Sequence, residues 1–213
     1  VVIKKLPSLY PQGGEKIITY NTTGRVIPEG KLPADIGVLV INVTSLAVLA
    51  NYIKTGMPLV SKSITVDGGG INNPKNLTVP IGTPFEEIFE YCGGLKPDAV
   101  KFLSGGPMMG VSVADASMSV LKQTNAITVL SKNETALDTP YSCINCGRCA
   151  SACPMNLTPA RVDSAMQFGK QEELIKLHPE YCIECGCCSY SCPSKRHLTQ
   201  TMRLAKTELK KSK

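Results

Sequence analysis

An α+β fold in three successive parts is predicted by three features of the sequence. A continuous apolar run followed by an amphipathic helix indicates an α/β part over residues 1–57. Short strands around one helix make residues 58–133 compatible with a β-grasp unit. Two cysteine blocks, each followed by helical sequence, indicate an α-helical part over residues 134–213. With 213 residues, of which 43% are apolar, the chain is long and apolar enough to form hydrophobic cores.

The first part is predicted from one strand and one helix. Residues 36–41 form an uninterrupted apolar run, which is typical of a buried parallel strand. Residues 44–55 repeat their apolar side chains on one helical face, and Gly56 is expected to end that helix. Thr44 or Ser45 is the expected N-cap.

The second part is predicted to contain three strands and a helix. The strands are expected over residues 59–66, 77–79 and 126–130, where β-branched residues are concentrated. The helix is expected over residues 84–91, with Thr83 as its N-cap in a capping-box pattern. Residues 133–140 then read as a linker to the third part.

The third part contains nine of the ten cysteines, in two blocks with the same pattern, C-x2-C-x2-C-x3-C-P. The pattern repeats at an offset of thirty-nine residues and is that of bacterial two-cluster ferredoxins. Helices are expected after each block, over residues 158–168 and 171–177 and from an N-cap at Ser194 onward. The sequence therefore predicts two [4Fe–4S] clusters.

The ligands are predicted to cross between the blocks, because the fourth cysteine of each block binds the other cluster in such proteins. The predicted ligands of the first cluster are Cys143, Cys146, Cys149 and Cys192, and those of the second are Cys182, Cys185, Cys188 and Cys153. Two zinc sites are the alternative, although zinc requires neither the third closely spaced cysteine nor the trailing proline. Cys187 is expected to face the protein without a ligand role, and Cys92 is expected to be a buried apolar residue. Both histidines are expected at the surface.

The charge balance does not indicate a nucleic-acid partner. The formal net charge of +6 falls to about +2 once two thiolate-bound clusters are counted. A local excess remains at residues 195–213, with seven Lys or Arg and one Glu. It is interpreted either as a solvated helical tail or as a docking patch for an acidic partner or membrane surface. Cluster thiolates favour a reducing compartment, hence the cytoplasm.

With these motifs, the chain resembles the C subunit of the Rnf electron transport complex over essentially its whole length. The segments that carry the resemblance are residues 10–16 (YPQGGEK), 32–38 (LPADIGV), 80–83 (PIGT), 104–110 (SGGPMMG), 182–185 (CIEC) and 192–196 (CPSKR). The resemblance implies that residues 58–133 are a soluble-ligand-binding β-grasp domain. It also implies that residues 134–213 are an α-helical ferredoxin domain.

Residues 1–57 are similar to the end of the flavin and NADH domain in the flavin subunit of respiratory complex I. The similarity implies FMN-side contacts at Glu15, Asn42 and Thr44 in the full-length protein, although that family has Glu where this chain has Thr44. No glycine-rich flavin loop precedes Tyr10, and the first methionine is Met57, so a fragment of a longer or processed chain is expected. We therefore expect this chain to bind neither FMN nor NADH tightly and to lack NADH dehydrogenase activity, which calorimetric titration with NADH tests.

The function implied is that of an electron-transfer subunit in a membrane-associated, ion-translocating NADH–ferredoxin oxidoreductase. The implied partners are other Rnf subunits, including membrane subunits and a ferredoxin-like subunit, on the cytoplasmic face of the cell membrane. The sequence contains no run of eighteen apolar residues, so peripheral association through partners is expected. Two alternatives stay open: a cobalamin reductase of a microcompartment, and a non-catalytic ligand-binding scaffold with structural clusters.

Overall fold

The computed structural model describes residues 1–135 and 139–211 and divides the chain into two compact units. One unit combines Val1–Ile41 with Thr139–Lys213 and holds both cysteine blocks, and we call it the cysteine unit. The other, Asn42–Asp138, holds the β-sheet, and we call it the sheet unit. The predicted linker at residues 133–140 lies partly outside the described residues.

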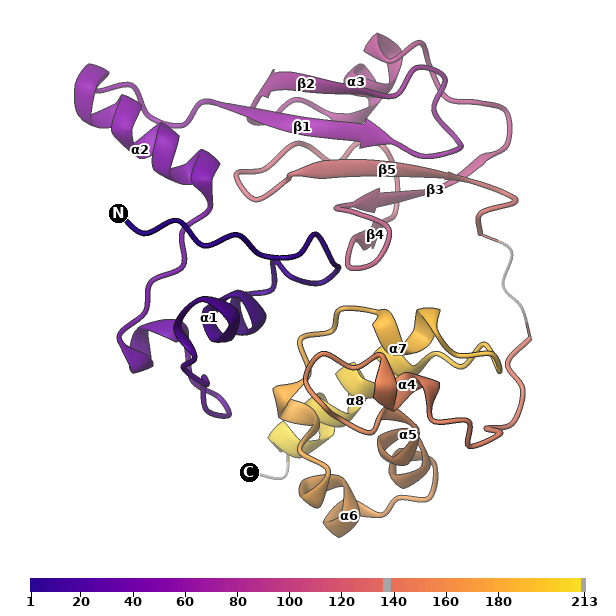
Figure 1. The fold of residues 1–213 in the computed structure, drawn as a ribbon. Coiled ribbons are helices and arrows are strands. Elements are labelled where there is room, and N and C mark those ends of the chain that lie inside the picture. The colour runs from indigo at the N-terminus through magenta and orange to yellow at the C-terminus, as the bar shows by residue number, and fades with distance from the viewer. Residues whose placement is uncertain (136–138, 212–213) are drawn as a thin grey trace. The chain divides into compact units, whose positions relative to one another are not determined.

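The sheet unit is built on a five-stranded mixed sheet with the strand order β2-β1-β5-β3-β4 (Figure 1). The central strands β1 and β5 are parallel, and every other neighbouring pair is antiparallel. The strands are β1 (Ser61–Asp67), β2 (Lys75–Pro80), β3 (Ala99–Ser104), β4 (Val111–Val113) and β5 (Ala126–Ser131). The predicted strands are thus present within one or two residues, whereas β3 and β4 were not predicted.

One helix, α3 (Phe85–Tyr91), supplies the apolar face that covers the two central strands. The core that it forms with β1 and β5 includes Phe85, Ile88, Phe89, Cys92, Ile64, Val66, Ile127 and Val129. Cys92 is fully buried there, which confirms the prediction that it is a buried apolar residue. The predicted cap of this helix was wrong: Pro84 is the N-cap, and the Thr83 hydroxyl donates to the Pro80 carbonyl instead.

Gly68 lies where the chain leaves β1, and we expect Gly68→Ala to destabilise the sheet unit. Its φ is +114°, and a Cβ there would stand 2.1 Å from the Val129 carbonyl oxygen of β5. The backbone strain costs about 1–3 kcal/mol, and the clash adds to it. Gly82→Ala is the matched control, since Gly82 has φ +99° but open space around its Cβ position. Urea unfolding measures the loss of unfolding free energy in each variant. Equal losses in the two variants would show that the clash at Gly68 adds nothing to the strain.

The sheet unit also contains α2 (Val43–Thr55), the helix predicted over residues 44–55. It ends at Gly56, which has a φ of +72°, as predicted. Its N-cap is Asn42, whose side-chain oxygen accepts the Thr44 N–H at 2.9 Å. The predicted caps Thr44 and Ser45 were wrong, because both lie inside the helix.

The cysteine unit starts with α1 (Glu15–Thr23) and the short 3-10 helix η1 (Pro33–Ile36). The predicted parallel strand at residues 36–41 was wrong, because residue 36 ends η1 and residues 38–41 form no strand. Leu39 is 78% exposed and Ile41 is 48% exposed. An apolar run becomes a parallel strand only when neighbouring strands accept its hydrogen bonds, and none of the described strands pairs with it.

The remainder of the cysteine unit is helical, as predicted. Its core is formed largely by α5 and α8, which pack against each other through residues such as Val162, Met202 and Ala205. The elements are α4 (Arg148–Ser151), α5 (Pro159–Gln167), α6 (Gln171–Lys176), η2 (Pro179–Tyr181), α7 (Cys187–Tyr190) and α8 (Leu198–Lys211). The predicted N-cap Ser194 was wrong, since α8 begins only at Leu198, after Lys195 has taken a φ of +53°.

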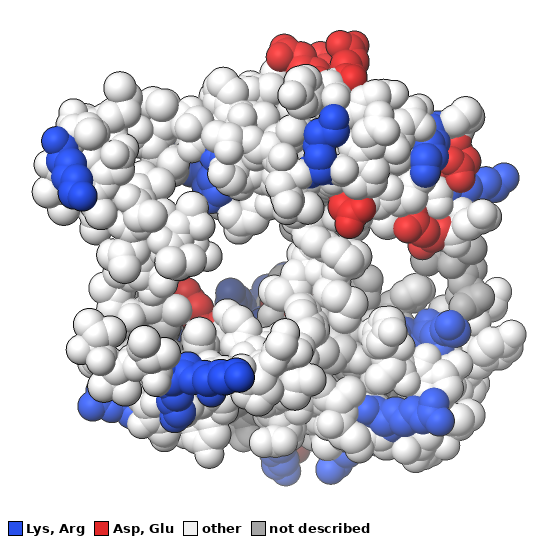
Figure 2. Space-filling model, turned by 45° about the horizontal axis from the view of Figure 1, so that its top comes forward, with Lys and Arg blue, Asp and Glu red and all other residues white. Residues whose placement is uncertain are grey.

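The surface charges are dispersed and often paired. Figure 2 shows Lys and Arg side chains on the viewed face in small groups separated by uncharged surface. Within the basic tail, Arg203 and Lys206 pair with Glu184, and Lys211 pairs with Glu208. These pairs favour the interpretation of the tail as a solvated helix over a docking patch. Among the described residues, no helix has the length and apolarity that a membrane span requires.

Candidate iron–sulfur sites

The two cysteine blocks adopt the same local backbone, thirty-nine residues apart. Residues with positive φ occur in matching pairs: Asn145 and Glu184 at 53° and 57°, Gly147 and Gly186 at 74° and 85°, and Asn156 and Lys195 at 54° and 53°. Helix α4 matches α7, and the start of α5 matches the start of α8. Left-handed residues between closely spaced cysteines reverse the chain locally, so successive thiols face one centre. The sequence repeat is therefore also a structural repeat.

Each block lines a small hollow together with one cysteine of the other block. The first hollow is lined by the thiol-bearing residues Cys143, Cys146, Cys149 and Cys192. The second hollow is lined by Cys153, Cys182, Cys185 and Cys188, and Cys187 also contributes to its lining. These are the two sets of four that the crossed assignment predicts, although iron ligation by each thiol stays a prediction.

The chemistry of these donors fits iron–sulfur clusters. Each hollow is lined by four cysteine residues, and a [4Fe–4S] cluster takes one thiolate at each of its four irons. Four cysteines can also hold a single zinc ion, but zinc requires neither the third closely spaced cysteine nor the proline that follows the fourth cysteine in both blocks.

The two hollows differ in their access to solvent. Cys143 and Cys146 of the first set are exposed, and Ile144 between them is 66% exposed. No cysteine of the second set is exposed, and Cys185 and Cys188 are buried. Burial and hydrogen bonding are the main protein contributions to the potential of a cluster, so the two sites provide unequal surroundings.

Two thiols of the second hollow, those of Cys182 and Cys188, have a raised pKa. Burial raises the pKa of Cys182 to about 11, although the Glu184 N–H, 3.3 Å from its Sγ, and the charge of Lys206 oppose the shift. Burial also raises the pKa of Cys188, against the hydrogen bond from Thr199. Iron binding at this hollow is therefore coupled to proton release.

A buried ion pair joins the end of the second block to α5. The Arg196 guanidinium donates two hydrogen bonds to Asp163 Oδ2, of which the Nε bond is 2.7 Å. The other carboxylate oxygen, Asp163 Oδ1, accepts the Thr201 hydroxyl at 2.9 Å. Arg196 also donates to the Tyr141 carbonyl, and the Tyr141 N–H donates to the Ser194 carbonyl. This network holds the segment after Cys192 beside the chain that enters the first block.

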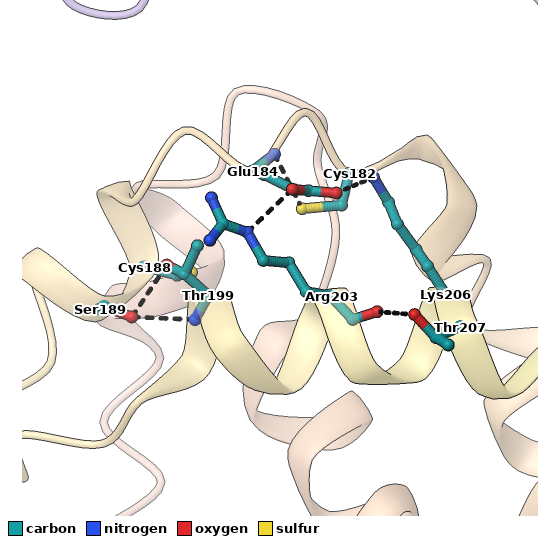
Figure 3. Close-up of polar contacts among 8 residues, drawn as sticks. All are labelled: Cys182, Glu184, Cys188, Ser189, Thr199, Arg203, Lys206 and Thr207. Atoms are coloured by element: carbon teal, nitrogen blue, oxygen red, sulfur yellow. Dashed lines mark hydrogen bonds and ion pairs between the residues drawn. The ribbon is translucent and has the colours of Figure 1, made fainter. Parts of the chain in front are cut away.

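Glu184 of the second block is held by two cations of α8 (Figure 3). Lys206 Nζ lies 2.7 Å from one carboxylate oxygen, and Arg203 Nε lies 2.9 Å from the other. Burial raises the pKa of Glu184, but these cations outweigh it and hold the pKa below its usual value. The carboxylate is thus ionised at neutral pH and fixes its loop on α8.

The N-terminal segment of the cysteine unit packs on the second block. The Tyr10 hydroxyl donates to the Cys185 carbonyl at 2.6 Å, and Lys16 Nζ stands 5.4 Å from the centre of the Tyr181 ring. His178 lies at the surface beside Glu29, and His197 is also exposed, as predicted for both histidines. The hydrogen bond between Tyr10 and Cys185 joins residues 175 apart in the sequence, so the spacing of the cysteines could not reveal it.

The residues predicted on the FMN side lie in different units. Glu15 is the first residue of α1 in the cysteine unit. Asn42 and Thr44 lie at the start of α2 in the sheet unit, joined by the capping hydrogen bond. A flavin role for any of the three stays a prediction.

Comparisons with known protein families identify the class. Residues 142–195 match the 4Fe-4S dicluster domain, residues 63–112 match the SLBB domain, and residues 1–51 match the Nuo51 FMN-binding domain. The chain is therefore an iron–sulfur protein of mixed α+β fold that joins parts of three known domains. These family matches confirm the predicted fold class and the two predicted [4Fe–4S] clusters.

Comparisons with curated proteins find similar C subunits in other organisms. The chain is 42% identical over 160 residues to the C subunit of a proton-translocating ferredoxin:NAD(+) oxidoreductase complex of Clostridium ljungdahlii, covering 75% of this chain and 35% of the relative. It is 41% identical over 207 residues to the C subunit of the Na(+)-translocating complex of Acetobacterium woodii, covering 97% and 47%. The chain is a homologue of these C subunits and spans about half or less of their length.

Proposed function

We propose that this chain is the two-cluster electron-transfer part of the C subunit in an ion-translocating ferredoxin:NAD(+) oxidoreductase. The observation that supports this function best is the pair of hollows, each lined by four cysteines in the crossed arrangement. Crossed ligation ties both sites into one helical core, which keeps them close enough for electron exchange. The similarity to the named relatives supports the choice of complex.

The residues of the chain bind, orient and shield the two sites. When bound, [4Fe–4S] clusters supply one-electron transfer, and no proton-transferring side chain is needed for it. The predicted ligands of the first site are Cys143, Cys146, Cys149 and Cys192, and those of the second are Cys182, Cys185, Cys188 and Cys153. The Arg196–Asp163 pair positions Cys192, and the Tyr10 hydroxyl holds the Cys185 carbonyl.

The three-part division is part of the proposal. Residues 1–57 are assigned to the C-terminal part of a flavin and NADH domain, residues 58–133 to an SLBB domain and residues 134–213 to the ferredoxin domain. In the full-length protein, Glu15, Asn42 and Thr44 lie on the side of FMN. The partners are membrane subunits and a ferredoxin-like subunit, and they hold the protein peripherally on the cytoplasmic face of the cell membrane.

The first test is an iron and sulfide determination with an EPR titration of the anaerobically purified chain. We expect about eight irons per chain and two reduced clusters whose spins interact, because two four-iron clusters share one core. About two zinc ions and no reducible signal would overturn the proposal and leave a zinc-stabilised module. Clusters that assemble but cannot be reduced would point instead to a scaffold. Cobalamin reduction by the full-length protein would point to a microcompartment reductase.

A further inference from the structure

The Thr199 hydroxyl reaches the Cys188 thiol in the second hollow, and the Ser189 hydroxyl contacts Thr199. Thr199 Oγ1 lies 3.7 Å from Cys188 Sγ and 2.9 Å from Ser189 Oγ. Ser189 Oγ also accepts the backbone N–H of Thr199 at 2.9 Å. The three side chains form one connected group at the start of α8 (Figure 3). Cys188 and Thr199 are each 8% exposed, so water competes little for these hydrogen bonds.

The direction of the hydrogen bonds follows from the ligand state of the thiol. A metal-bound thiolate carries no hydrogen, so Cys188 Sγ can only accept, and Thr199 must donate its hydroxyl hydrogen to it. The Thr199 oxygen can then accept the hydroxyl hydrogen of Ser189, whose own oxygen accepts the Thr199 N–H. Each hydrogen bond polarises the next, which strengthens the final donation to sulfur.

The structural repeat shows that the first hollow lacks this arrangement. At the offset of thirty-nine, Cys149 corresponds to Cys188, and the positions of Ser189 and Thr199 are occupied by Ala150 and Ala160. Ala160 lines the first hollow with Cys149, and its methyl group cannot donate to sulfur. The first block is thus an internal control. It shares the local backbone of the second block but has no hydroxyl donor at the position of Thr199.

We propose that Thr199, supported by Ser189, raises the reduction potential of the cluster held by Cys153, Cys182, Cys185 and Cys188. Reduction adds negative charge to the cluster and its thiolates, so a donor to sulfur stabilises the reduced state more than the oxidised state. Thr199 is a tuning residue that adds a hydrogen-bond donor to the difference in solvent access between the two sites. This inference rests on the proposed function, since both sites must hold clusters.

The test is Thr199→Val, a near-isosteric change that removes the hydroxyl and keeps the backbone N–H to Ser189. The readout is an EPR-monitored redox titration of the reconstituted chain. We expect one cluster to become about tenfold harder to reduce, a shift of about 59 mV downward for one electron, while the other is unchanged. Thr199→Ser is the matched control, because it keeps the hydroxyl donor. In this variant we expect the reduction potential of the same cluster to change by only a small fraction of that shift.

The reciprocal variant installs the hydroxyl pair at the first hollow. Ala150→Ser with Ala160→Thr places the same two hydroxyls beside Cys149, and we expect the other cluster to become about tenfold easier to reduce. This variant keeps the inference testable even if Thr199→Val fails to assemble its cluster.

The outcomes separate this inference from the proposed function. About eight irons in every variant with unchanged potentials would overturn the tuning role and leave the proposed function intact. A parent chain without clusters would overturn the proposed function itself. Equal shifts in Thr199→Ser and Thr199→Val would also contradict the inference, because the hydroxyl would then not be the cause.

Discussion

Replacing Cys192 with alanine is expected to remove the cluster of the first block rather than that of the second. Cys192 lines the first hollow together with Cys143, Cys146 and Cys149, as the proposed crossed ligation requires. The single variant should retain about half of the iron, or about four atoms per chain. The same loss would follow from uncrossed ligation, so the single variant cannot by itself identify the partner block.

Two double variants decide between crossed and uncrossed ligation. With crossed ligands, Cys146→Ala with Cys192→Ala damages one site twice, and the chain should keep about four irons. Cys146→Ala with Cys153→Ala damages both sites, and the chain should keep almost none. Each double variant is the matched control for the other, because both lack two cysteines. Iron determination that reverses this order would show that each block binds its own cluster.

Replacing Asp163 with alanine is expected to cost about 3–5 kcal/mol in the free energy of unfolding, the usual cost of breaking a buried ion pair from one side. The Asp163 side chain is 10% exposed and that of Arg196 is 17% exposed, so the unpaired guanidinium would gain little hydration. The Thr201 hydroxyl would also lose its acceptor. Urea unfolding of the anaerobic, iron-loaded chain measures the loss.

The matched control is Glu173→Ala, which breaks the exposed pair with Arg161. The side chains of Arg161 and Glu173 are 65% and 34% exposed, so the loss of their pair should cost about 1 kcal/mol or less. If Asp163→Ala and Glu173→Ala lose the same stability, the network around Arg196 does not hold the second block in place. A selective loss of iron from the first site in Asp163→Ala would further support that role, because Arg196 follows Cys192 closely.

Local patterns were sufficient for much of the fold and for the composition of the candidate sites. The spacing of the cysteines predicted two sites because most ligands of one cluster lie within a few residues of one another. The helices over residues 84–91 and 44–55 were predicted from periodicity and from a terminal glycine, which act through neighbouring residues. The caps were less predictable, since Asn42 and Pro84 rather than the nearby threonines and serine occupy those positions.

Features that depend on distant residues were decided by tertiary structure. The apolar run at residues 36–41 could become a strand only with strand neighbours, and strand β3 exists because β5 and β4 pair with it on either side. Thr199 is eleven residues from Cys188, and Asp163 is thirty-three from Arg196. The sequence alone established the cysteine repeat, the two sets of donors and the main helices, all of which rest on short-range spacing. The folded chain alone decided which hydroxyl reaches sulfur and which carboxylate meets the guanidinium, because such contacts form only when remote segments pack together.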